Sequence, residues 1–263
     1  MKLRIFQIDA FTGEIFHGNP AGVCPLDSWL AEPMLLAIAA EMNLSETCFF
    51  VGGNGRYEIR WFTPLTEIDL CGHATLAAAW VLVNELGETA DPIRFSSRSG
   101  ELPVRRKGAP STFTLDFPAQ PAKPCEVPDN LLLALGELRP LEVLGAEDYL
   151  VVLENETEVR TFAPDIARLS GLPKRGVIVT ARGDAVDFVS RWFGPNVGVD
   201  EDPVTGSAHT TLAPYWAERL DKRCLKARQI SKRVGELECE LAGSRVFISG
   251  SAVKFLDGEI EIR

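Results

Sequence analysis

Two short segments combine a glycine with small and polar residues at a spacing that suits anion binding. They are Cys71-Gly72-His73-Ala74 and Thr205-Gly206-Ser207-Ala208, and each opens an apolar run that predicts a helix. The N–H groups in the first turn of a helix have no intrahelical partner and carry a partial positive charge. The two turns therefore suit a carboxylate or a developing oxyanion. Plain helix capping by Thr205 or Ser207 is the alternative interpretation.

His73 follows Gly72 directly, at the positive end of the predicted helix. That position lowers the proton affinity of an imidazole and favours the neutral ring, which can both donate and accept a proton. His73 is thus a candidate general acid or proton relay, with a packing or capping histidine as the alternative. We expect no metal site, because His17, His73 and His209 are the only histidines and none lies in an H-x-H or H-E-x-x-H pattern.

Glu46 leads into the apolar run Cys48-Phe49-Phe50, which predicts a buried strand. A carboxyl group surrounded by apolar side chains has a raised pKa, which suits a base that shuttles protons near neutrality. The alternative is a surface glutamate at the end of a strand.

Asp202 and Cys71 are further candidates near the two glycine segments. Asp202 precedes Pro203 and could orient a base or hold a substrate ammonium or hydroxyl group, or it could only complement a helix dipole. The thiol of Cys71 lies at a predicted helix start, where its pKa would fall. The equivalent residue of the second segment is Thr205, however, so no opposing thiol is expected.

The elements that must position these residues are many short strands and fewer helices. Strands are predicted over 2–9, 46–51, 56–63, 92–98, 112–117, 148–153, 176–181, 186–193, 236–241 and 245–257. Helices are predicted over 31–42, 72–86, 128–136, 164–171 and 206–220. This mixture predicts an α+β protein.

An internal repeat organises these elements. Arg60-Trp61-Phe62-Thr63-Pro64 recurs 131 residues later as Arg191-Trp192-Phe193-Gly194-Pro195, and at the same offset Val177 stands opposite Glu46. The repeat predicts two pseudo-symmetric lobes with a cleft between them. Only the first lobe carries the glutamate. Prolines at 118, 121 and 124 place the boundary nearby, giving lobes of 1–118 and 119–263, with the C-terminal strands free to return to the first lobe.

Composition excludes several classes of protein. The 263 residues contain 27 Lys and Arg against 37 Asp and Glu, a net charge of −10, which disfavours nucleic acid and membrane surfaces as partners. Six cysteines without a C-x-x-C pair indicate free thiols, and no apolar run is long enough for a membrane helix. We expect a cytoplasmic protein. The basic run from Arg219 to Arg233 is interpreted as a solvated face.

Read together, several strings resemble the PhzF-like family of phenazine-biosynthesis isomerases. They occur in family order and are Asp9-Ala10-Phe11-Thr12, Gly18-Asn19-Pro20-Ala21, Asn43-Leu44-Ser45-Glu46-Thr47, Phe62-Thr63-Pro64, Cys71-Gly72-His73-Ala74-Thr75 and Asp202-Pro203-Val204-Thr205-Gly206-Ser207-Ala208-His209.

The resemblance implies a diaminopimelate-epimerase-like fold in which each lobe wraps a curved sheet around a central helix and the active site lies in the cleft. It implies isomerisation by proton transfer without a cofactor, on a small carboxylate-bearing substrate; the reaction that names the family isomerises trans-2,3-dihydro-3-hydroxyanthranilate. By motif position Glu46 is the general acid/base, with His73, Asp202 and Ser207 as supporting polar residues and with Gly72 and Gly206 as substrate-binding residues.

The resemblance is also compatible with a homodimer. Two other functions stay open: a one-base epimerase or racemase of an amino or hydroxy acid, and a non-catalytic protein that binds a small molecule. Racemases of this fold use two opposed cysteines, and Thr205 at the second position leaves that mechanism without support.

Overall fold

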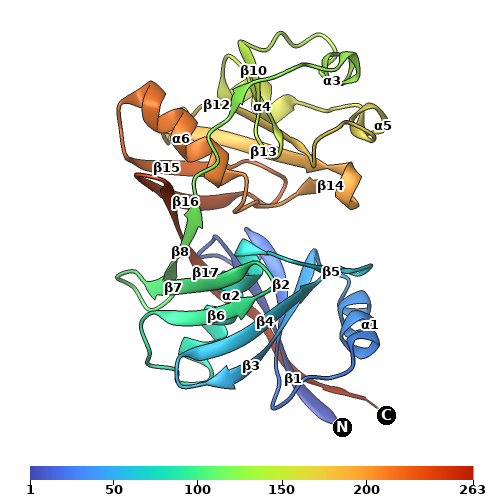
Figure 1. Cartoon of the computed structure of the whole chain (residues 1–263), viewed down its shortest axis with the longest axis vertical. Coiled ribbons are helices and arrows are strands. Elements are labelled where there is room, and N and C mark those ends of the chain that lie inside the picture. Colours follow the sequence, from blue (N-terminus) through green and yellow to red (C-terminus); the bar gives the residue numbers. More distant parts are fainter. Residues whose placement is uncertain (263) are drawn as a thin grey trace. The chain divides into compact units, whose positions relative to one another are not determined.

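The computed structural model describes residues 1–262, and these form two compact units (Figure 1). Unit 1 comprises Met1–Asp116 together with the chain from Ile248 onward, and unit 2 comprises Phe117–Phe247. The sequence predicts lobes of 1–118 and 119–263; in the structure the last strand is grouped with unit 1, so its second lobe ends at Phe247.

Unit 1 is built from strands with two helices. Its elements are β1 (Lys2–Ala10), β2 (Asn19–Pro25), α1 (Glu32–Met42), β3 (Glu46–Gly53), β4 (Arg56–Phe62), β5 (Glu67–Ile68), α2 (Gly72–Asn84), β6 (Ile93–Ser97), β7 (Gly100–Arg106) and most of β8 (Thr112–Pro118) and β17 (Arg245–Glu261).

Unit 2 follows a related plan. Its elements are β9 (Lys123–Pro124), α3 (Asp129–Ala134), β10 (Glu142–Gly145), β11 (Tyr149–Val152), α4 (Glu156–Thr161), α5 (Ile166–Leu169), β12 (Val177–Arg182), β13 (Phe188–Gly194), the 3-10 turn η1 (Pro195–Val197), β14 (Val199–Asp202), α6 (His209–Leu220), β15 (Cys224–Gln229) and β16 (Gly235–Ala242). The α+β prediction is confirmed.

The strand pairing repeats between the units in the order that the sequence repeat predicts. In unit 1, β2 pairs parallel with β3, β3 antiparallel with β4, β4 antiparallel with β5 and parallel with β6. In unit 2, β11 pairs parallel with β12, β12 antiparallel with β13, β13 antiparallel with β14 and parallel with β15. Glu46 and Val177 are the first residues of the equivalent strands β3 and β12.

Helix α2 is the central helix of unit 1. Nine of its side chains are buried, and it contacts β1, β2 and β3. Alanine and valine fill this helix on several faces, because a helix enclosed by strands has no face left for polar side chains. In unit 2 the equivalent helix α6 contacts β15 and β16 (Figure 1).

Seven of the strands among residues 1–262 lie outside the ranges predicted from the sequence: β2, β5, β7, β9, β10, β14 and β15. Strand β2 contains Pro20, Gly22 and Pro25, which read as a loop, yet it pairs with both β1 and β3. Gly22 permits this close pairing, since a Cβ there would lie 2.6 Å from Oγ1 of Thr47.

Strand β15 lies inside the basic run from Arg219 to Arg233. Its side chains alternate, with Leu225 and Ala227 buried and Lys226 exposed. Lys226 and Arg228 therefore lie on the outer face of a strand whose other face belongs to the core of unit 2.

Candidate active site

Glu46 and His73 lie side by side in unit 1. Oε2 of Glu46 is 3.2 Å from Nε2 of His73, and the two side chains are only 14% and 5% exposed. Strand β3 begins at Glu46, and helix α2 begins at Gly72, one residue before His73. The start of a strand and the start of a helix thus place a carboxylate against an imidazole where both side chains are largely buried.

The other side of the His73 ring faces two buried groups. Nδ1 lies 3.2 Å from the amide Nδ2 of Asn19 and 3.5 Å from Sγ of Cys71. An amide NH₂ can only donate, so Nδ1 acts as the acceptor of this contact. A neutral His73 then carries its proton on Nε2, the nitrogen that faces the Glu46 carboxylate.

The start of α2 lies beside this pair. The residue at its N-cap is Cys71, and no side chain caps the helix. The hydroxyl of Thr75 donates to the carbonyl oxygen of Cys71 at 2.6 Å, which fixes the turn. No side-chain cap occupies this helix start, and the first turn of a helix is the kind of position that binds an anion.

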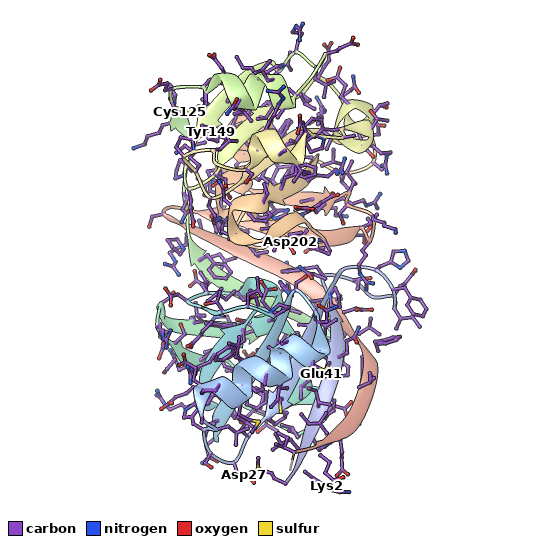
Figure 2. The ribbon with its side chains drawn as sticks, turned by 90° about the vertical axis from the view of Figure 1, so that its right-hand side faces the viewer. Lys2, Asp27, Glu41, Cys125, Tyr149 and Asp202 are labelled. Atoms are coloured by element: carbon purple, nitrogen blue, oxygen red, sulfur yellow. The ribbon has the colours of Figure 1, made fainter. Side chains whose placement is uncertain are left out.

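In unit 2, Asp202 ends β14 and anchors the loop that follows it (Figure 2). The hydroxyl of Thr205 donates to Oδ2 of Asp202 at 2.6 Å. The buried amide of Gln229 spans the same loop: it donates to the carbonyl oxygen of Asp202 at 2.8 Å and accepts from the N–H of Thr205 at 2.9 Å. Thr205 occupies the place equivalent to Cys71, and its hydroxyl is held by Asp202.

Gly206 and Ser207 precede α6 and do not form its first turn. The prediction that this helix begins at residue 206 is wrong by three residues, since it begins at His209. The N–H of His209 donates to the carbonyl oxygen of Gly206 and that of Thr210 to Ser207, both at 3.0 Å. These i to i+3 bonds form a tighter 3-10-like turn ahead of the α-helix.

An arginine reaches Ser207 from outside the predicted site. Nη2 of Arg175 donates to Oγ of Ser207 at 3.1 Å and to Oδ2 of Asp148 at 2.6 Å. Burial lowers the pKa of Arg175, but the hydrogen-bonded carboxylate of Asp148 outweighs this, so the pKa lies above its usual value.

Sequence reasoning missed Arg175, Asp148 and Asn19 as site residues. Asn19 belongs to the Gly18-Asn19-Pro20-Ala21 string, which was a usable signal. Asp148 is the first residue of the strand predicted over 148–153, and Arg175 immediately precedes the strand predicted over 176–181. Nothing in their local pattern distinguishes them from surface charges.

The described residues include one group with the donors of a metal site. Ligand atoms of Glu46, Cys71 and His73 lie within 4.8 Å of one another, and thiolate, imidazole and carboxylate are the ligand types that zinc prefers. The two ring nitrogens face different partners, Nε2 toward Glu46 and Nδ1 toward Cys71. The contacts as they stand describe a hydrogen-bonded cluster around His73.

Among residues 1–262 no helix has both the length and the apolar character that crossing a membrane requires.

Known proteins with similar sequences and structures agree with this fold. An uncharacterized isomerase of Pseudomonas aeruginosa is 58% identical over 262 residues, covering all of both chains. The crystal structure of a PhzF-family phenazine biosynthesis protein from Enterococcus faecalis superposes with a TM-score of 0.95 at 44% identity, again over all of both chains.

A more distant structure shares the fold alone. A hydroxyproline epimerase from Agrobacterium vitis matches with a TM-score of 0.60 at 11% identity, covering 98% of this chain and 92% of the epimerase. The fold is thus the one found in PhzF-family proteins and in epimerases of the proline and diaminopimelate type. The profile of phenazine biosynthesis-like proteins, PhzC-PhzF, matches residues 8–258, and the chain belongs to this family.

Proposed function

We propose that this protein is an isomerase that moves a proton on a small carboxylate-bearing substrate without a cofactor, with Glu46 as the general acid/base. The observation that carries the proposal is the 3.2 Å contact between Oε2 of Glu46 and Nε2 of His73 in a nearly buried setting. A base in such a place meets its substrate with little competition from water.

The proposed reaction conserves protons and electrons within the substrate. Glu46 removes a proton from one carbon, and the electron pair of that C–H bond forms a new double bond to the neighbouring carbon. The electron pair of the original double bond moves to its far carbon and takes up the returned proton there. His73, with its proton on Nε2, lies 3.2 Å from the carboxylate and is proposed to return a proton to it. Asp202, Ser207 and the N–H groups at Gly72 and Gly206 are proposed to support the same reaction by binding polar groups of the substrate.

Deuterium incorporation tests this proposal. The full chain is incubated in D₂O with a panel of small carboxylates that includes dihydro-hydroxyanthranilate and amino acids, and products are followed by NMR and mass spectrometry. We expect incorporation into one compound, and a loss of about 10²–10⁴-fold in Glu46→Gln, the size typical of a missing general acid/base.

Glu41→Gln is the matched control, because Glu41 is an exposed glutamate on α1 (Figure 2) and should retain the wild-type rate. Full exchange in Glu46→Gln would refute the assigned base. Exchange that survives dialysis against a chelator supports the cofactor-independent part of the proposal, and loss of exchange under dialysis contradicts it.

Chiral analysis of the same product distinguishes the isomerase from a one-base epimerase or racemase. An isomerase moves a double bond, whereas an epimerase returns the proton to the carbon it left and inverts that centre. Tight binding of a compound without any exchange would favour the non-catalytic binding protein.

A further inference from the structure

The Asp148 carboxylate accepts hydrogen bonds from two other side chains of unit 2. It is 2% exposed and accepts from Nε of Arg175 at 3.0 Å, from Nη2 of Arg175 at 2.6 Å and from Nε1 of Trp192 at 3.0 Å. The guanidinium also lies over the Trp192 ring, 5.2 Å from its centroid. A two-point hydrogen bond and a ring contact together leave the guanidinium little freedom to rotate.

The guanidinium of Arg175 also contacts the side chain of Ser207. Nη2 donates to Oγ of Ser207 at 3.1 Å, and a guanidinium has donors only. Ser207 must therefore accept this bond, which leaves its own hydroxyl hydrogen for a different acceptor. Arg175 thus determines the direction in which Ser207 can donate.

The hydroxyl of Thr205, two residues earlier, makes a different hydrogen bond. Thr205 donates its hydrogen to Oδ2 of Asp202 at 2.6 Å and so has no hydrogen left for a ligand. Of these two hydroxyl groups, only that of Ser207 can donate its hydrogen to a ligand, because the Thr205 hydrogen is used by Asp202. The guanidinium adds a positive charge beside it, which favours a negatively charged acceptor.

We propose that Arg175 is a positioning residue: held by Asp148 and Trp192, it orients Ser207 to donate its hydroxyl hydrogen to a carboxylate oxygen of the substrate. This inference rests on the proposed function, because it names how the carboxylate of that substrate is recognised. It also assigns a purpose to the buried Asp148, which the proposed proton transfer does not use.

A double-mutant cycle with a carboxylate probe tests the inference. The probe is benzoate, and its neutral counterpart is benzamide, which has the same ring without the charge. The affinities of both are measured by isothermal titration calorimetry on the full chain for wild type, Arg175→Gln, Ser207→Ala and the double variant. Arg182→Gln is the matched control, because Arg182 is an exposed arginine at the far end of β12.

We expect Ser207→Ala and Arg175→Gln each to weaken benzoate binding about 10-fold or more, as the loss of a hydrogen bond to a charged group does. The double variant should bind benzoate no more weakly than Arg175→Gln, because both substitutions remove the same oriented donor. Benzamide affinity should change much less, Arg175→Lys should recover part of the benzoate affinity, and Arg182→Gln should match wild type.

Three results would overturn the inference. They are wild-type protein that does not bind benzoate, Arg175→Gln that binds benzoate normally, and losses from the two substitutions that simply add. A purely structural role would weaken benzoate and benzamide equally and lower the melting temperature. None of these readouts needs turnover, so this inference and the role of Glu46 can fail separately.

Discussion

Asn19 and His73 form a contact of 3.2 Å between Nδ2 and Nδ1, with the asparagine fully buried. The amide donates to the ring, so the ring proton lies on the opposite nitrogen, which faces Glu46. The orientation of the proposed base therefore depends on a residue that neither donates nor accepts the transferred proton.

Asn19→Asp should reverse this arrangement. An aspartate offers acceptors only, so it should draw a proton to Nδ1 of His73 or stabilise the charged ring. We expect a changed nitrogen spectrum of the ring by NMR and exchange reduced about 10–100-fold, the usual cost of altering such a supporting residue. The control is Asn84→Asp, because Asn84 is exposed and lies at the end of α2, the helix that carries His73. An unchanged ring spectrum in Asn19→Asp would show that this contact does not set the tautomer.

Cys71→Ala separates the glutamate mechanism from a thiol mechanism. Sγ of Cys71 lies 3.5 Å from Nδ1 of His73, but the equivalent position in unit 2 is Thr205, so a pair of thiols is unavailable. We expect Cys71→Ala to lose less than about 10-fold in exchange rate, well below the loss expected for Glu46→Gln. A loss as large as that of Glu46→Gln would make the thiol a participant in proton transfer.

His209 should make the folded protein sensitive to acid. Its ring is completely buried, Nδ1 donates to the carbonyl oxygen of Thr205 at 2.9 Å, and within residues 1–262 Nε2 has no hydrogen-bond partner. Burial lowers the pKa of His209 from 6.5 to about 4. The unfolded chain therefore takes up this proton at a higher pH than the folded chain.

The contribution of His209 to stability is complete above pH 6.5 and is lost as the pH falls toward about 4, where the folded state also becomes protonated. A shift of this size corresponds to about 3 kcal/mol. Urea unfolding at pH 7.5 and pH 4.5 measures it, with His209→Gln as the comparison. Equal pH dependence in the two proteins would contradict the assignment.

Glu88 stabilises the turn between β3 and β4 in unit 1. Its Oε2 accepts from the hydroxyl of Tyr57 at 2.7 Å and from the N–H of Gly55 at 2.8 Å, and Oε1 accepts from the N–H groups of Thr89 and Ala90. The hydrogen bond from Tyr57, followed by those from the backbone, lowers the pKa of Glu88 to about 2.

Glu88→Gln should lower the free energy of unfolding by about 1–3 kcal/mol, because an amide nitrogen cannot accept one pair of these bonds. Thermal unfolding at pH 7 measures the loss, with Glu41→Gln as a control that should be neutral. Unchanged stability in Glu88→Gln would mean that water replaces the lost acceptor.

Sequence reasoning reached the fold because the repeat has a physical basis. Arg60 and Arg191 each form a two-point ion pair with a glutamate of the following short strand, Glu67 and Glu201. The two arginines are 131 residues apart and the two glutamates 134, because the second copy has three more residues between them. The offset of 131 correctly matches Glu46 with Val177 at the starts of β3 and β12.

Strand β2 and the Arg175–Asp148 pair could not be predicted, because both depend on contacts between residues far apart in the sequence. Strand β2 carries residues that usually avoid strands, and its two neighbours in unit 1 override that preference. The pairing of Arg175 with Asp148 joins residues 27 positions apart, and neither differs locally from an ordinary surface charge. The roles proposed for Glu46, His73, Asp202, Ser207, Gly72 and Gly206 stay predictions until exchange is measured.

The pairing of β17 with β1 has a consequence for the order in which the protein is made. Lys2 lies opposite Glu261, and this antiparallel ladder continues to Ala10 and Ala252, so unit 1 is assembled from two stretches separated by the whole of unit 2 (Figure 1). During translation all of unit 2 leaves the ribosome while β1 still lacks this partner. The nascent chain must therefore keep an incomplete first unit soluble until β17 emerges, and the second unit is the first that can finish folding.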